Sequence, residues 1–209
     1  MPKRRSIPEV PLKRAVEVLV NGGIVVFPTD TSYGLAVDAT NLTAIRRLYR
    51  LKGRGFDKPI HVIPPSRAYV GRVAIAGAAA CKLMASFWPG PLTLVLPLRA
   101  ADPALSKIKG SRGLGFRWPD HPIAQALARK LKKPVTATSA NVSGRPDAYS
   151  VGEVLRQFRG RRLKPDFYLD GGVLKKVIPS TIVYLDRNRV TILRKGPVSE
   201  RAIKKTLRK

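Results

Sequence analysis

The chain has 209 residues, of which 44% are hydrophobic, so it is long enough to bury one sizeable core, and we expect a single domain over residues 1–209. One cysteine and two histidines exclude a disulfide framework, a cysteine-rich zinc site and a histidine-rich metal site. Forty Lys and Arg against thirteen Asp and Glu give a formal charge of +27, which favours contact with polyanions such as RNA.

No membrane or secretion signal is evident in the sequence. No apolar run reaches the roughly 18 residues that a membrane helix needs, and the first residues, "MPKRRSIPEVPLKR", lack the apolar stretch of a secretory signal. We therefore expect a cytoplasmic protein without membrane contact.

Helices and strands alternate along the chain. Apolar residues at helical spacing, ended by glycines, predict helices over 8–23 and 41–53. Two more helices are expected over 74–88, with Cys81 in the core, and over 121–131. Strands are expected over residues 23–28, 34–39, 58–64, 91–98, 112–119, 133–138, 167–170, 180–185 and 190–196. This interleaving predicts an α/β fold in which helices flank a twisted, mixed or partly parallel sheet.

The segment "LKGRGFDKP", residues 51–59, places three cations around two glycines. Lys52, Arg54 and Lys58 supply charge, and the glycines allow the backbone to approach a ligand closely. The segment is therefore a candidate phosphate cradle, although a glycine-rich turn with exposed lysines has the same pattern. The standard phosphate loop, the dinucleotide fingerprint and a serine nucleophile elbow are all absent, so any phosphate is expected to meet side-chain cations and scattered backbone groups.

A second polar segment, "VTATSANVSGRP" at residues 135–146, is rich in hydroxyl groups and follows a short apolar run. Hydroxyls bind neutral and anionic oxygens without adding charge to a cationic site. A helix cap followed by a glycine turn is the structural alternative for this segment, as a turn after a strand is for Asp30 and Thr31.

Seven stretches resemble, in order, the motifs of the YrdC-type family of L-threonylcarbamoyladenylate synthases. They are "FPTDTSYGL", "LKGRGFDKP", "WPGPLTLVLP", "GLGFRWPDHP", "TATSANVSGRP", "PSTIVYL" and "ILRKG", and the resemblance runs from about residue 10 to residue 198. It implies a YrdC-like α/β domain curled around a large, basic, concave cavity. The implied reaction joins L-threonine, bicarbonate or CO2, and ATP into threonylcarbamoyl-AMP and pyrophosphate, with Mg²⁺ carried by ATP. The product would feed tRNA N6-threonylcarbamoyladenosine modification through a separate transferase complex.

The resemblance also implies roles for individual residues. The residues matching the family's threonine contacts are Thr31, Arg117, Ala137 and Ser180. Those matching its nucleotide contacts are Arg54, Lys58, Gly113, Ser139, Asn141, Asp147 and Arg194. Lys52, Arg54 and Lys58 match the cations expected to act in catalysis at the phosphates.

Two positions depart from the family pattern. Many relatives carry histidine where this chain has Ile63, and its own His61 lies two residues earlier, on the same face of the expected strand. We expect His61 to be structural. Asp147 stands where serine is common beside the nucleotide.

The residue types suit the implied chemistry. A carbamate formed on the threonine amine already carries a nucleophilic oxygen, so attack on the α-phosphate requires no serine or cysteine nucleophile. Positioning of the substrates and neutralisation of phosphate charge are then the main catalytic tasks. A bidentate arginine suits the carboxylate of the amino acid, and several cations suit a triphosphate.

Two alternatives remain at this stage. The charge of +27 also suits a module that binds double-stranded RNA or tRNA without catalysis. A role in carbamoyl transfer, as in the YrdC-type part of hydrogenase-maturation proteins, is disfavoured because those proteins add zinc-finger and acylphosphatase regions, for which one cysteine and 209 residues leave no room.

Overall fold

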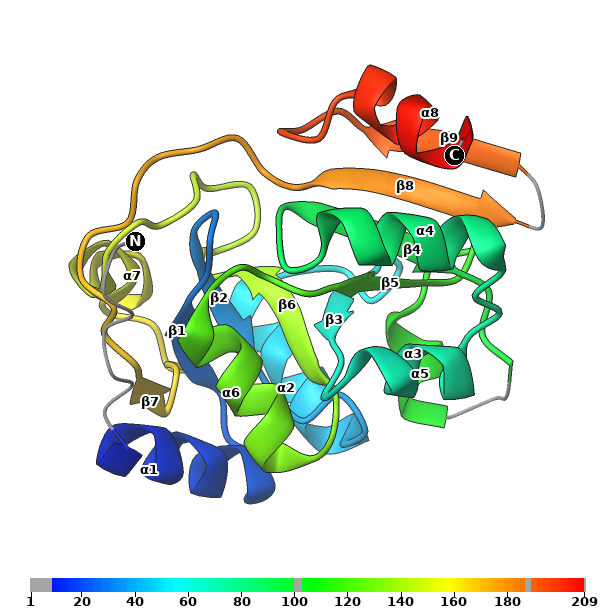
Figure 1. Ribbon diagram of the computed structural model, residues 1–209. Coiled ribbons are helices and arrows are strands. Elements are labelled where there is room, and N and C mark those ends of the chain that lie inside the picture. The colour runs from blue at the N-terminus through cyan, green and yellow to red at the C-terminus, as the bar shows by residue number, and fades with distance from the viewer. Residues whose placement is uncertain (1–8, 100–102, 187–188, 209) are drawn as a thin grey trace.

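Nine strands form one mixed sheet in the order β7-β1-β2-β6-β3-β5-β4-β8-β9 (Figure 1). The computed structural model describes residues 9–99, 103–186 and 189–208. Its strands are β1 (Val25–Pro28), β2 (Tyr33–Ala36), β3 (His61–Ile63), β4 (Leu92–Leu96), β5 (Leu114–Arg117), β6 (Val135–Ser139), β7 (Phe167–Tyr168), β8 (Thr181–Asp186) and β9 (Arg189–Arg194). The pairs β1–β7, β3–β5 and β4–β8 are parallel, and the other neighbours are antiparallel. The predicted α/β class with a mixed sheet is confirmed.

Helices lie on both sides of this sheet. They are α1 (Glu9–Val20), α2 (Leu42–Lys52), α3 (Arg67–Val73), α4 (Ala78–Phe87), α5 (Pro103–Ile108), α6 (Pro122–Leu131), α7 (Val151–Phe158) and α8 (Glu200–Arg208). The four predicted helices correspond to α1, α2, α4 and α6, although Pro8, the first residue of the first prediction, lies outside the described residues. The other four helices were not predicted.

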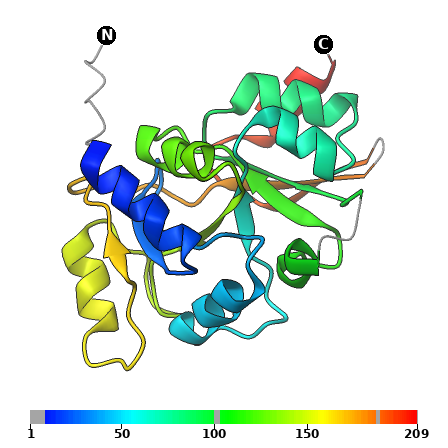
Figure 2. The same ribbon diagram turned by 90° about the horizontal axis from the view of Figure 1, so that it is seen from below.

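Two hydrophobic clusters pack against opposite faces of the sheet. Val25 and Phe27 of β1 belong to the cluster that contains α1 and α6, whereas the alternate residues Ile24 and Val26 belong to the larger cluster with α2, α4 and α5. This alternation follows from the two-residue period of a strand. Helices α1 and α6 lie side by side over their face (Figure 2).

One expectation about the core is wrong. Cys81, predicted to be buried, is exposed, because α4 begins only at Ala78 and turns Ala80, Leu83 and Met84 toward the core.

Helix α2 leads into the cationic loop. A side-chain cap defines the start of the helix, and a backbone cap defines its end. The Asn41 Oδ1 atom accepts hydrogen bonds from the backbone N–H groups of Thr43 and Ala44, both at 3.0 Å. At the other end, Gly53 adopts φ 61°, a left-handed conformation that suits glycine. The segment after Gly53 is thereby turned back toward β3.

We expect Asn41→Ala to lower the free energy of unfolding by about 1 kcal/mol, because two N–H groups at the helix start lose their acceptor. Urea titration followed by circular dichroism measures this change. Thr43→Ala, in the same exposed turn, is the matched control and should stay within about 0.5 kcal/mol of the parent protein. Equal stability of the two variants would contradict the capping role.

Candidate functional site

A cavity of about 240 Å³ opens at the middle of the sheet. It is lined by Thr31, Ser32, Arg54, Pro59, Ile60, His61, Arg117, Ala137, Thr138, Ser139, Asp147, Pro179, Ser180 and Arg194. These residues come from the β1–β2 loop, the segment between α2 and β3, the strands β3, β5 and β6, the segment between β6 and α7, the residues just before β8 and the end of β9. Segments far apart in the sequence therefore meet at one polar site.

Eight of the predicted site residues line this cavity. They are Thr31, Arg54, Arg117, Ala137, Ser139, Asp147, Ser180 and Arg194. Four others do not line it: Lys52, Lys58, Gly113 and Asn141. The expectation of a large basic cavity remains a prediction, whereas the convergence of these eight residues is a feature of the structure.

The guanidinium group of Arg117 is the best-defined element of the cavity. Its Nη2 donates to Asp30 Oδ1 at 2.6 Å, and its Nη1 donates to Thr31 Oγ1 at 3.0 Å. Arg117 Nε and Asp30 Oδ2 are buried and have no partner among the described residues. Burial lowers the pKa of Arg117, and Asp30 opposes that shift. The pair thus leaves one buried donor and one buried acceptor with unused hydrogen-bonding capacity.

The β1–β2 loop is held in shape by Thr29. Its hydroxyl donates to the carbonyl of Ser32 at 2.7 Å and accepts hydrogen bonds from the N–H groups of Thr31 and Ser32. This closed turn, which was the structural alternative for Asp30 and Thr31, fixes Thr31 beside Arg117 at the cavity, and the threonine contact of Thr31 remains a prediction.

Lys52 is buried and acts as a clamp between two segments. Only 1% of the residue is exposed, and its ammonium donates to the carbonyls of Ser139 and Asn141 and to Asn141 Oδ1 at 2.5, 2.9 and 3.0 Å. Burial, reinforced by Arg54, lowers the pKa of Lys52 to about 7. The three acceptors match the three protons of the ammonium form. All three donors of Lys52 are engaged within the protein. Its predicted contact with phosphate stays a prediction.

The second polar segment owes its composition to the same clamp. Asn141 Oδ1 also accepts from Ser139 Oγ at 2.7 Å, and the N–H of Ser143 donates to the carbonyl of Lys52 at 2.8 Å. Thr136 bonds the backbone of β2 instead, donating to the Leu35 carbonyl. Ser139 lines the cavity, as do Ala137 and Thr138 of the same segment, whereas Thr136, Asn141 and Ser143 do not.

Ser180 and Arg194 form the opposite wall. Arg194 donates to the carbonyl and hydroxyl of Ser180 at 3.0 and 3.1 Å, and Thr93 Oγ1 lies 2.9 Å from the Ser180 hydroxyl. The chain after β9 approaches β8 so closely that a Cβ at Gly196 would lie 2.4 Å from the N of Thr181. The glycine of "LRKG" therefore lets Arg194 reach the cavity.

Lys58 and Gly113 lie away from the cavity lining. Lys58 is exposed, and its carbonyl accepts the hydroxyl of Tyr49 at 2.8 Å. Gly113 has φ 130°, and a Cβ there would lie 2.2 Å from the Leu96 carbonyl oxygen, so close packing against β4 accounts for the glycine. The nucleotide contacts expected of these two residues remain predictions.

His61 lines the cavity; the expectation that it is structural remains a prediction. Burial, followed by the nearby Arg194, Arg117 and Arg54, lowers the pKa of His61 to about 4, so the ring is neutral at pH 7. Ile63 packs instead in the cluster with α1 and α6. The two-residue period of a strand indicated that His61 and Ile63 share a face of β3. It could not indicate where on that face the cavity lies, because the neighbouring strands determine its position.

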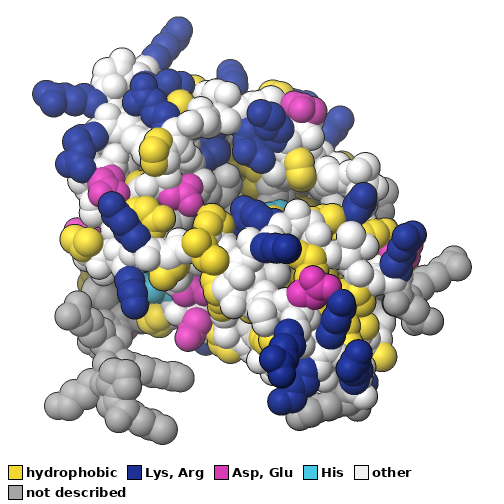
Figure 3. Space-filling view, turned by 90° about the horizontal axis from the view of Figure 1, so that it is seen from above, with side chains coloured by type: hydrophobic (Ala, Val, Ile, Leu, Met, Phe, Trp, Pro, Cys, Tyr) yellow, Lys and Arg dark blue, Asp and Glu magenta, His cyan; other side chains and the backbone are white. Residues whose placement is uncertain are grey.

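Charge around the site is strongly asymmetric. Arg54, Arg117 and Arg194 line the cavity, and Asp147 is the one carboxylate among its lining residues. Lys and Arg side chains also spread over the face seen in Figure 3, with few acidic groups between them. Within residues 9–99, 103–186 and 189–208, no cluster of three or more His, Cys, Asp or Glu is placed to hold a metal ion, and no helix is long and apolar enough to cross a membrane.

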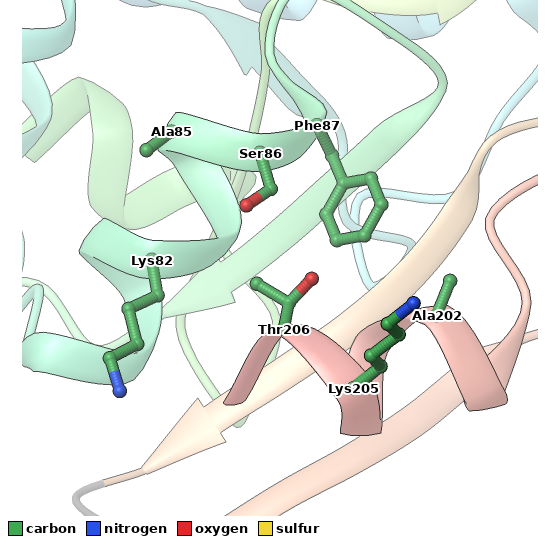
Figure 4. A pocket seen from close by; sticks show the side chains of 7 residues that line it. All are labelled: Lys82, Ala85, Ser86, Phe87, Ala202, Lys205 and Thr206. Atoms are coloured by element: carbon green, nitrogen blue, oxygen red, sulfur yellow. The ribbon is translucent and has the colours of Figure 1, made fainter. Parts of the chain in front are cut away.

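A second hollow lies between α4 and α8 (Figure 4). It is lined by Lys82, Ala85, Ser86, Phe87, Ala202, Lys205 and Thr206. None of the predicted site residues belongs to it, and its lining lacks the convergent polar groups found at the sheet. The central cavity is therefore the candidate active site.

Comparisons with known proteins agree with this fold. A family model described as "Telomere recombination", which covers the Sua5, YciO and YrdC proteins, matches residues 17–196. The threonylcarbamoyl-AMP synthase of Vibrio cholerae is 36% identical over 151 residues, which are 70% of this chain and 79% of that protein. The threonylcarbamoyl-AMP synthase of Pyrococcus abyssi is 33% identical over 205 residues, 98% of this chain.

The crystal structure of P. abyssi Sua5 complexed with L-threonine matches with a TM-score of 0.88 at 33% identity, covering 98% of this chain. The chain spans 59% of that Pyrococcus protein and 55% of the synthase of Bacillus subtilis. The similarity thus extends over nearly all of this chain and over little more than half of these two relatives.

Lys52→Met should lower the free energy of unfolding by at least about 2 kcal/mol, because buried oxygens of Ser139 and Asn141 lose their donor. Thermal or urea unfolding measures this loss. Lys82→Met, on the exposed side of α4, removes the same charge and should change stability by less than about 0.5 kcal/mol. Comparable effects of the two substitutions would refute the clamp.

Proposed function

Because the chain belongs to the Sua5, YciO and YrdC family, we propose that it is a threonylcarbamoyl-AMP synthase that uses L-threonine, bicarbonate or CO2, and ATP. The observation that carries the proposal is the cavity around Arg117, in a chain of which 98% matches a Sua5 structure complexed with L-threonine. A module that binds RNA without catalysis is not favoured, since the curated relatives compared above are named as synthases.

The amino acid binds at the Arg117 end of the cavity. Its carboxylate accepts hydrogen bonds from the guanidinium group of Arg117, which lines the cavity. Asp30 holds the other edge of the guanidinium group, and Thr31 offers its hydroxyl beside it. Ala137 and Ser180 line the same cavity and complete the expected threonine contacts.

ATP binds toward Arg54 and Arg194, with Ser139 in the same wall. Arg54 has a buried Nε without a described partner, and Arg194 anchors on Ser180 while its charge faces the cavity. Magnesium arrives with ATP as part of the substrate, and Asp147 is the lining carboxylate that suits an oxygen-binding cation. Guanidinium groups placed in advance offset the charge of the polyphosphate without reorganisation.

The reaction itself requires no nucleophile from the protein. The free amine of threonine attacks CO2, forming an N–C bond and releasing one proton to water, which leaves a carbamate. A carbamate oxygen then attacks the α-phosphorus, the bond from that phosphorus to the bridging oxygen breaks, and pyrophosphate leaves. The cavity holds both reactants and neutralises the developing charge. The product would pass to a tRNA-modifying transferase complex in the cytoplasm.

The decisive assay is pyrophosphate release by the purified protein with ATP, magnesium and bicarbonate, after nuclease treatment and a high-salt wash. Release that depends on L-threonine and falls without bicarbonate is expected. Threonine-independent release, or none from folded protein, would refute the proposal.

In the same assay, Arg117→Ala should raise the KM for threonine about 10- to 100-fold, because a charged hydrogen bond contributes about 1.5 to 3 kcal/mol. Arg194→Ala should mainly raise the KM for ATP. Arg129→Ala, on the exposed face of α6, is the control and should change neither. Equal effects of the two cavity variants on both substrates would contradict the assignment of two ends.

A further inference from the structure

His61 occupies the middle of the sheet and faces the cavity. Its strand, β3, is fifth in the order of nine, with β6 and β5 on either side. The ring lies directly over Gly115 of β5, where a Cβ would come within 2.3 Å of His61 Cδ2. A glycine at this position is therefore what leaves room for the imidazole.

The imidazole has no hydrogen-bond partner in the described part of the chain, whereas three hydroxyls of the same cavity are engaged. Thr31 is engaged by Arg117, Ser180 by Arg194, and Ser139 donates to Asn141. The two ring nitrogens of His61 have no partner among the described residues, yet neither is fully buried. They are therefore accessible from the cavity. A polar ring is thus free to bind what enters.

Burial, and after it the charges that face this ring, keep it neutral. Arg54, Arg117 and Arg194 line the cavity with this ring and supply positive charge. The carboxylates nearby are Asp147, in the same lining, and Asp30, which is bound to Arg117. Together with burial, the arginines hold the pKa of His61 at about 4. A neutral imidazole offers one acceptor nitrogen, whereas guanidinium groups only donate. His61 is therefore an uncharged ring acceptor beside three guanidinium donors, in a lining that also contains hydroxyl groups.

An amino-acid substrate needs such an acceptor. Its carboxylate is served by Arg117, but its amino group is a donor and must be unprotonated to attack CO2. A carboxylate partner would favour the ammonium form, whereas a neutral imidazole accepts an N–H without adding negative charge. We propose that His61 binds the amino group of the amino-acid substrate and presents it as the free amine. This role rests on the proposed function.

The test compares two ligands by calorimetry in the presence of magnesium and a non-hydrolysable ATP analogue. One ligand is L-threonine, and the other is 3-hydroxybutyrate, which keeps the carboxylate and hydroxyl but lacks the amino group. His61→Phe keeps a flat ring without nitrogens and should weaken L-threonine about fivefold to tenfold, leaving 3-hydroxybutyrate unchanged. His61→Gln, which retains an acceptor, should recover part of the loss.

Two further variants protect this test from a folding artefact. Gly115→Ala displaces the ring without changing it and should give the same amine-specific loss. His121→Phe alters the other histidine, which does not line the cavity, and should leave both affinities unchanged.

Unchanged threonine affinity in His61→Phe, or equal weakening of both ligands, would overturn the inference while leaving the synthase proposal in place. Failure of the parent protein to bind L-threonine at all would remove both.

Discussion

The buried ammonium of Lys52 is the interaction on which the cavity depends. It ties the end of α2 to the end of β6 through three oxygens of Ser139 and Asn141. The segment that follows α2 carries Arg54 into the cavity, and the end of β6 carries Ala137 and Ser139. This clamp joins two segments that are distant in the sequence, and it acts together with the pairing of β3 with β6 and the hydrogen bond from Ser143 N–H to the Lys52 carbonyl.

The cationic groups of the cavity lie on two different walls. Arg117 sits between the closed turn at Thr31 and the central strand, where its partly used guanidinium suits a carboxylate. Arg194 reaches in from the far wall, supported by Ser180. His61 lines the same cavity as a neutral ring. A cavity that places cations for two anionic groups beside a neutral imidazole suits the proposed pair of an amino acid and a nucleotide.

Much of this arrangement follows from the sequence, and the exceptions have physical reasons. Strand alternation and the ordered motifs predicted the fold class and eight lining residues. They did not reveal that Lys52, the last residue of α2, is buried while Lys58 in the following loop is exposed, because the burial of Lys52 depends on tertiary contacts with Ser139 and Asn141. Helix α8 escaped prediction because Ile203 is its one fully buried residue. The sequence did not show that His61 lines the cavity, because its neighbour Gly115 lies on another strand.

The most direct test of the central claim is product analysis with ¹³C-labelled bicarbonate, L-threonine, ATP and magnesium. Mass spectrometry should detect an adenylate that contains threonine and carries the ¹³C label, formed in equal amount to pyrophosphate. An adenylate without the label, or no threonine-containing adenylate despite folded protein, would contradict the assignment of this cavity to threonylcarbamoyl-AMP synthesis.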